Sequence, residues 1–249
     1  MSIACAVVMD PINAINTTKD STFAMLLEAQ RRGYALYYIK PGSLSVRSGK
    51  AWAQMASLRV IDRKENWYEL SDQEARPLTD VQIVLMRNDP PVDSNYLHDS
   101  IILSLAQKDG VLIMNDPQGL RDLNEKLAAL LFPQCCPETL VSRDKAELKT
   151  FAETHGEVVL KPLDGMGGRS IFRSHHGDTN LNVIIETLTD NGKALVMAQR
   201  YIPEISAGDK RILLIDGEPV PYCLARIPQG TEFRGNLAAG GRGEGRPLS

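Results

Sequence analysis

Short apolar runs and amphipathic segments alternate along the first half of the chain. Residues 3–9 are a continuous apolar run, as expected for a strand buried on both faces of a parallel sheet. Asp20 and Ser21 can cap a helix over residues 22–32 that ends at Gly33. The same alternation continues as a strand over 35–39, a strand over 81–86, a helix over 97–108 and a strand over 111–114. This pattern predicts an open α/β sheet with helices on its faces.

The pattern changes near residue 120, where hairpins begin to dominate. A helix is predicted over 120–132, and Asp144 with Glu147 forms a capping box for a helix that ends at Gly156. The remaining predicted elements are a helix over 181–189 and strands over 194–199, 211–215 and 219–225. We therefore expect an α/β domain over 1–122 and an α+β domain over 123–249. Residues 41–80 show only weak strand patterns around 52–60, and their order is left open.

Composition excludes several classes of protein. The 249 residues carry a net charge of −3, so no basic surplus points to nucleic acid. No apolar run approaches the roughly 20 residues of a membrane span, and the N-terminus lacks the basic start of a signal peptide. The four cysteines show no metal-binding spacing. Reduced thiols in a cytoplasmic protein without a membrane partner are therefore expected.

The segment 158–170 carries the most specific chemical signal. An apolar run ends in Lys161, three glycines follow within residues 165–168, and a strand-like segment resumes at 171. The lysine can supply a fixed positive charge, and glycines allow backbone N–H groups to approach anionic oxygens. A P-loop is excluded, because its lysine follows the glycines and a helix comes after it. The segment thus indicates a polyphosphate site on a β-hairpin, and a plain hairpin with a glycine-rich turn is the alternative.

Two further segments suggest ligand contacts. Polar residues follow the predicted strands at Asp10 and again at 87–91, and ligands of open α/β sheets bind at such strand ends. The planar guanidinium of Arg87 is suited to binding a carboxylate. Simple strand termination is the alternative. In residues 234–243 arginines alternate with small residues, a composition suited to a mobile loop that closes over an anionic intermediate. A disordered tail is the alternative there.

Long motifs across the whole chain resemble bacterial glutathione synthetase, a member of the ATP-grasp ligases. They are VVLKPLDGMGG, GDKR, DGEPVPYCLARIPQG and RGNLAAGGRG in the second half, and VMDPINAIN and MRNDPP in the first. The resemblance implies ATP-dependent ligation of γ-glutamylcysteine with glycine, through an acyl phosphate, with release of ADP and phosphate. It also implies a substrate-binding domain over 1–122 and an ATP-grasp domain over 123–249. The lid subdomain of the latter would cover about 123–200, and a second subdomain would begin at 201–249.

The resemblance assigns roles to matching positions. The residues expected to bind ATP are Lys126, Lys161, Gly165, Met166, Gly167, Gly168, Gln199, Arg200, Tyr201, Ile202 and Asp209. The expected catalytic residues are Arg211, Arg226, Arg234, Gly240, Gly241 and Arg242, and the expected substrate contacts are Arg87, Asp89 and Asn236. Arg200 stands where the family has asparagine, a change that adenine recognition through backbone groups would tolerate.

The resemblance further implies Mg²⁺, with Mn²⁺ as a substitute, and a homotetramer. The family's metal ligands would lie beyond Ser249, so we expect an incomplete ATP-grasp domain that binds nucleotide weakly and does not turn over. Two other functions stay open at this point. One is another ATP-grasp carboxylate–amine ligase, and the other is a non-catalytic fragment that only binds nucleotide.

Overall fold

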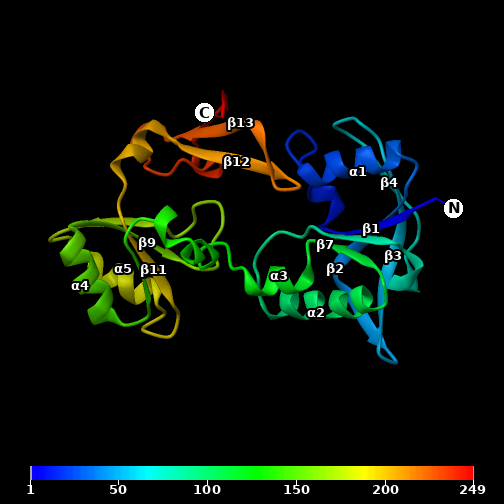
Figure 1. The fold of residues 1–249 in the computed structure, drawn as a ribbon, viewed down its shortest axis with the longest axis horizontal. Coiled ribbons are helices and arrows are strands. Elements are labelled where there is room, and N and C mark those ends of the chain that lie inside the picture. The colour runs from blue at the N-terminus through cyan, green and yellow to red at the C-terminus, as the bar shows by residue number, and fades with distance from the viewer. Residues whose placement is uncertain (1, 249) are drawn as a thin grey trace. The chain divides into compact units, whose positions relative to one another are not determined.

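A computed structural model describes residues 2–248 of the chain, and two compact units divide between Asn124 and Glu125 (Figure 1). Among the described residues the first unit is built on a seven-stranded sheet in the order β4-β3-β2-β1-β6-β7, with β5 also paired to β3. Its strands are β1 (Ala4–Val8), β2 (Ala35–Arg47), β3 (Lys50–Val60), β4 (Tyr68–Leu70), β5 (Glu74–Pro77), β6 (Ile83–Met86) and β7 (Leu112–Met114). Strands β2, β1, β6 and β7 run parallel, which confirms the predicted α/β sheet.

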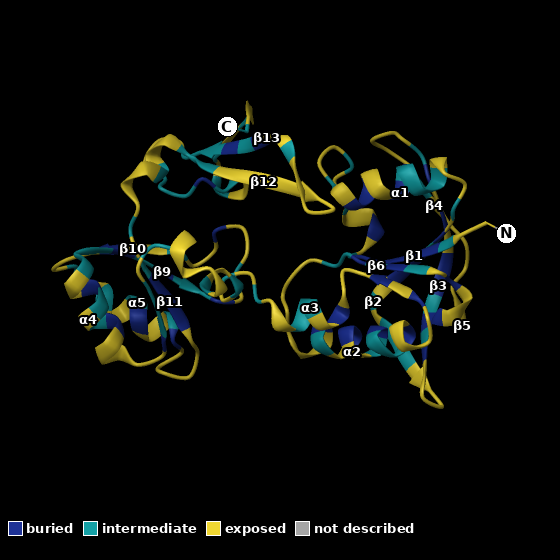
Figure 2. Ribbon diagram, viewed as in Figure 1, coloured by how far each residue is buried: buried dark blue, intermediate teal, exposed yellow. Residues whose placement is uncertain are grey.

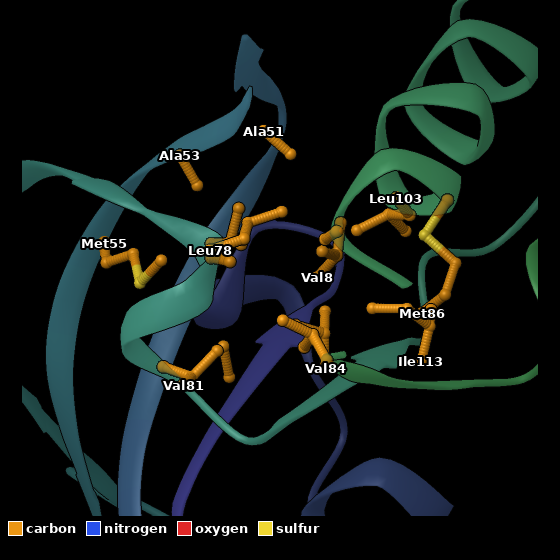
Figure 3. Close-up of a cluster of buried hydrophobic side chains, with 14 of the residues drawn as sticks. Val8, Ala51, Ala53, Met55, Leu78, Val81, Val84, Met86, Leu103 and Ile113 are labelled. Atoms are coloured by element: carbon orange, nitrogen blue, oxygen red, sulfur yellow. The ribbon is translucent and has the colours of Figure 1, made fainter. Parts of the chain in front are cut away.

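Two helices cover opposite faces of this sheet. Side chains along β1 alternate between the two faces of the sheet. Ala6 and Val8 lie in one core cluster, which also contains Leu103 of α2 (Ser94–Lys108). Val7 lies in the other core cluster, which also contains Leu26 of α1 (Ser21–Arg31). Figure 3 shows the first of these clusters. Asp20 caps α1 by accepting a hydrogen bond from the backbone N–H of residue 23, as predicted. A third helix, α3 (Pro117–Asp122), ends the unit.

The antiparallel part of the sheet is the least predictable portion of this unit. Strand β2 continues through Pro41 and Gly42, which normally interrupt strands, with a register shift between Ile39 and Leu44. It pairs with β3 through a two-residue turn at Ser48 and Gly49, whose φ angles are 48° and 76°. Positive φ at both positions matches the twist of the paired strands. The weak strand pattern around 52–60 is thus one arm of a long hairpin.

The second unit has two sheets among its described residues. An antiparallel sheet in the order β10-β9-β11-β8 packs against two helices through Leu148, Leu160 and Ile185. A three-stranded sheet, β12-β13-β14, follows, and both faces of β12 are largely exposed (Figure 2). The elements are β8 (Thr139–Ser142), α4 (Lys145–His155), β9 (Glu157–Pro162), β10 (Phe172–His175), α5 (Leu181–Leu188), β11 (Val196–Arg200), β12 (Asp209–Ile215), β13 (Glu218–Ile227) and β14 (Arg242–Pro247).

Short 3₁₀ turns complete the described chain. They are η1 (Ile12–Ala14), η2 (Leu78–Asp80), η3 (Ala128–Leu131), η4 (Pro133–Cys135), η5 (Pro203–Ala207) and η6 (Leu237–Ala239).

The predicted helix over 120–132 is wrong. Helix α3 ends at Asp122, and only the short turn η3 follows. Arg121 donates to the hydroxyls of Ser100 and Ser104 in the first unit, whereas Lys126 donates to backbone carbonyls of the second. The helix therefore breaks where the chain leaves the contacts of the first unit and enters those of the second. Helix propensity depends on local sequence and does not reflect such tertiary contacts.

Two other expectations need correction. Asp144 caps α4 as predicted, but Glu147 does not return a hydrogen bond to it; the Ser142 hydroxyl links the two by donating to Glu147 and accepting from the Asp144 N–H. Arg242 and Gly243, expected within a loop, begin strand β14 and pair with Ile227 and Arg226. Backbone pairing with β13 requires no apolar periodicity, so the side-chain pattern did not indicate this strand.

Candidate nucleotide-binding site

The alternation of β9 places Lys161 on the open face of its sheet. Val158 and Leu160 point into the core beneath α4 and α5, so Val159 and Lys161 occupy the opposite face. The Lys161 ammonium donates to Gln199 Oε1 at 2.6 Å, and Gln199 Nε2 donates to Thr139 Oγ1 at 2.9 Å. This relay across three strands holds a positive charge at a fixed position.

A cavity of about 250 Å³ opens over this face. Eight of the residues expected at the site line it, namely Lys161, Gln199, Arg200, Tyr201, Ile202, Asp209, Arg234 and Asn236. Gly235 belongs to the loop over residues 234–243 that the sequence indicated, whereas the other five lining residues were not assigned to the site, namely Pro137, Val159, Ile171, Ile205 and Phe233. Val159 could have been found from the two-residue period that links it to Lys161, whereas the others depend on tertiary contacts. Apolar walls with a few convergent polar groups are typical of a small-molecule site.

The glycine-rich turn between β9 and β10 presents unpaired amides. Within residues 2–248 no acceptor takes the backbone N–H of Gly165, Met166, Gly167 or Gly168. Gly167 and Gly168 have φ angles of +65° and +81°, which favour glycine. On the other side of the turn, Lys126 donates to the carbonyls of Leu163 at 3.1 Å and Gly165 at 2.7 Å. The turn therefore offers donors suited to an anion.

The two lysines are close enough to interact electrostatically. Burial lowers the pKa of Lys161, and the positive charge of Lys126 lowers it further. A phosphate placed between two ammonium groups would relieve that repulsion and restore the charged form of Lys161. The Glu125 carboxylate, which pairs with Lys126 at 2.7 Å, partly offsets that repulsion in the free protein.

This arrangement predicts proton uptake on nucleotide binding at alkaline pH. In the free protein Lys161 loses its proton below its ordinary pKa of 10.5, and a bound triphosphate raises that pKa again. ATP affinity should therefore fall as the pH rises through the lowered pKa. Calorimetry over a series of alkaline pH values, in buffers of different ionisation enthalpy, measures the uptake. Lys161→Gln should reduce it, and proton release by the wild type would contradict the assignment.

An ion pair links the two strands beside the cavity. Arg226 on β13 donates from Nε to Asp209 Oδ1 at 2.6 Å and from Nη2 to Asp209 Oδ2 at 2.9 Å. The bidentate geometry fixes both side chains, since each strand supplies one partner. An ideal Cβ on Gly235 would lie 2.7 Å from the Arg226 carbonyl oxygen, so the loop passes this pair where only glycine fits. At the cavity rim, Arg200 donates to Glu138 at 2.6 Å.

The loop after β13 contacts the glycine turn. Arg234 Nη1 donates to the Gly168 carbonyl at 2.6 Å. An ideal Cβ on Gly168 would lie 2.9 Å from Asn236 Oδ1, and one on Gly167 would lie 3.7 Å from the Ala238 Cβ. Two segments about 70 residues apart in sequence therefore form one wall.

The other expected site residues lie outside the cavity lining. Lys126 interacts electrostatically with Lys161, the glycine turn follows Lys161 along the chain, and Met166 is exposed. Arg211, Gly240, Gly241 and Arg242 lie on β12, in the loop and at the start of β14, and the Arg242 guanidinium pairs with Glu244 at 2.6 Å.

Arg87 and Asp89 belong to the first unit, at the carboxyl end of β6. Arg87 Nε donates to Thr22 Oγ1 at 3.1 Å, and the Asp89 N–H donates to Asp10 Oδ2 at 2.7 Å. Burial raises the pKa of Asp89, and the charge of Asp10 adds to the shift. The polar loops that follow β1 and β6 therefore contact each other at this sheet edge.

Neither a metal cluster nor a membrane helix is found in the described part of the chain. No group of three or more His, Cys, Asp or Glu side chains among residues 2–248 is placed to hold a metal ion. No helix among these residues has the length and apolar character needed to cross a bilayer.

Comparison with known proteins identifies the class. A D-cycloserine synthetase structure superposes with a TM-score of 0.59 at 16% identity, covering 90% of this chain and 68% of that one, which shows a shared fold. The profile of the prokaryotic glutathione synthetase ATP-grasp domain matches residues 125–249. The second unit is therefore an ATP-grasp domain, the fold class of ligases that activate a carboxylate with ATP.

The profile of the prokaryotic glutathione synthetase N-terminal domain matches residues 3–121. The glutathione synthetase of Xanthomonas campestris is 66% identical over 249 residues, which are 100% of this chain and 79% of that protein. The Escherichia coli O127:H6 enzyme is 56% identical over 247 residues, covering 99% and 78%. The chain belongs to the prokaryotic glutathione synthetase family. These relatives give no support to the alternative of a different ATP-grasp ligase.

Proposed function

We propose that this protein joins γ-glutamylcysteine to glycine with ATP, releasing ADP and phosphate and yielding glutathione. The observation that carries the proposal is the cavity of the second unit, where a fixed ammonium, Lys161, adjoins a turn of unpaired amides over residues 165–168. Family membership supplies the substrates, since relatives of 56–66% identity over nearly the whole chain are glutathione synthetases.

The proposed nucleotide contacts follow the chemistry of the cavity. Apolar side chains, among them Val159 and Ile171, would contact the adenine, and the backbone of residues 199–202 would read its polar edge. Lys161, Lys126 and the glycine turn would hold the phosphates. Asp209 would orient the ribose while it holds Arg226.

The chemistry requires two anions to meet, because a substrate carboxylate attacks the γ-phosphorus of ATP. Arg226, Arg211 and Arg234 would stabilise the charge that develops on the transferred phosphoryl group. Glycine's amine then attacks the acyl phosphate, which water would otherwise hydrolyse. The loop over residues 234–242 would exclude that water, and its contact with the glycine turn through Arg234 supports this role. No protein nucleophile is required.

The first unit would bind γ-glutamylcysteine. Arg87 offers a guanidinium to a carboxylate, and Asp89, beside Asp10, offers negative charge to an ammonium group. Asn236 of the loop would contact substrate as well. Under this proposal residues 1–122 form the substrate-binding domain and residues 123–249 form the ATP-grasp domain. The lid subdomain of the ATP-grasp domain would extend to about residue 200.

The remaining proposals concern metal, location and assembly. Mg²⁺, with Mn²⁺ as a substitute, would screen the phosphates when bound. A cytoplasmic location is supported by four free cysteines. A homotetramer is supported by the family resemblance alone.

Product analysis tests the ligation. The protein is incubated with Mg²⁺, ATP, γ-glutamylcysteine and glycine, and the products are quantified by mass spectrometry. We expect glutathione, ADP and phosphate in equal amounts, and none of the tripeptide when glycine is omitted. AMP with pyrophosphate, or an equal rate with a different amino-acid acceptor, would contradict the proposal.

A further inference from the structure

The carboxylate of Glu232 sits in a small receptor for anions on the loop after β13. Its Oε1 accepts hydrogen bonds from the backbone N–H of Phe233 at 2.9 Å and of Arg234 at 3.0 Å. The Arg234 guanidinium donates from Nε to Oε1 at 2.9 Å and from Nη2 to Oε2 at 2.6 Å. Two successive amides and a guanidinium fork are donors that bind phosphate as well as carboxylate oxygens.

This receptor adjoins the nucleotide cavity. Phe233 and Arg234 both line the cavity. Arg234 also donates from Nη1 to the Gly168 carbonyl at 2.6 Å, and its Cδ lies 3.3 Å from where a Cβ on Gly168 would be. The occupied receptor is thus next to the glycine turn, whose amides have no acceptor within residues 2–248.

Protonation does not release the carboxylate. The hydrogen bonds from Arg234 lower the pKa of Glu232 to about 2, so the side chain stays ionised at neutral pH. A competing anion, and not protonation of Glu232, is therefore the way to release Arg234 at neutral pH. An ionised carboxylate left beside an arriving phosphate would repel it.

We propose that the amides of Phe233 and Arg234, with the Arg234 guanidinium, form a binding site for a phosphoryl group, and that Glu232 occupies this site as an internal competitor. The inference deepens the proposed function and rests on it, because the ligand is a phosphoryl group of the nucleotide or of the acyl phosphate. No covalent bond changes. Glu232 keeps Arg234 paired in the free protein and leaves its donors when the phosphoryl group enters.

The test is Glu232→Gln. The glutamine carbonyl still accepts from the two amides, so the turn is retained while the competing charge is removed. We expect ATP and tripolyphosphate to bind about tenfold more tightly than to the wild type, and adenosine to bind equally. Calorimetry measures all three, and circular dichroism checks the fold.

Two comparisons make the result specific. Glu28→Gln removes a carboxylate that also pairs with guanidinium groups, those of Arg31 and Arg32 at the C-terminal end of α1, and whose pKa is likewise lowered to about 2. This substitution should leave ATP affinity unchanged. In an Arg234→Ala background, Glu232→Gln should have no effect. Unchanged or weaker ATP binding by the folded Glu232→Gln protein would overturn the inference. The proposed function would fail separately, if the wild type bound no ATP or made no glutathione.

Discussion

Replacing Lys161 by alanine should weaken ATP binding by roughly 10- to 150-fold, the equivalent of about 1.5–3 kcal/mol for a lost charged hydrogen bond. The ammonium is held on the cavity face of β9 by Gln199, and the proposed phosphate site depends on its charge. Adenosine, which lacks phosphates, should bind the variant about as well as the wild type. Calorimetric titration with ATP and with adenosine measures the difference.

Lys193→Ala is the matched control for this result. Lys193 belongs to the same unit, its side chain is 76% exposed, and it pairs only loosely with Asp190 at 3.4 Å. Its loss should leave ATP affinity unchanged. If Lys161→Ala bound ATP as tightly as Lys193→Ala does, the role of Lys161 would be wrong.

Replacing Gly235 by alanine should cost about 1–3 kcal/mol of folding free energy, because a Cβ at this position has no room. It would lie 2.7 Å from the Arg226 carbonyl oxygen and 3.1 Å from Asp209 Oδ2. The loop or the Arg226–Asp209 pair must shift, and ATP binding should weaken with either change. Urea unfolding measures the stability, and calorimetry measures the affinity.

Gly245→Ala is the control for this steric effect. Gly245 lies on β14 opposite Leu224, and a methyl group added there would have no other atom within 4 Å. This substitution should change stability by no more than about 0.5 kcal/mol. Equal effects of the two substitutions would show that backbone entropy, and not the close approach at Gly235, is responsible.

Local patterns predicted much of the framework. Continuous apolar runs indicated the parallel strands β1 and β6, and Asp20 and Asp144 marked the starts of α1 and α4. Each of these signals depends on neighbouring residues alone, through burial or through a cap. The hairpin of β9 and β10 was indicated by the apolar run that ends at Lys161 and by the glycines between the two strands.

Features that depend on distant partners were missed. The stretch 120–132 has helical composition, yet Arg121 contacts the first unit and Lys126 contacts the second. Phe233 lines the cavity because its loop folds back on a turn some 65 residues earlier. The pairing of Asp209 with Arg226 follows from the register of β12 and β13, which neither residue reveals. Tertiary context decided these cases, as it commonly overrides local preference.

The amides of the turn over residues 165–168 and the ammonium of Lys161 are proposed to receive the triphosphate of ATP, and the proposed nucleotide site depends on that contact. Amide nitrogen NMR during titration tests it most directly, because the N–H groups of Gly165, Gly167 and Gly168 have no acceptor within residues 2–248. We predict that a non-hydrolysable ATP analogue shifts these three resonances strongly and that adenosine does not. Saturable binding of the analogue that leaves all three unchanged would contradict the claim.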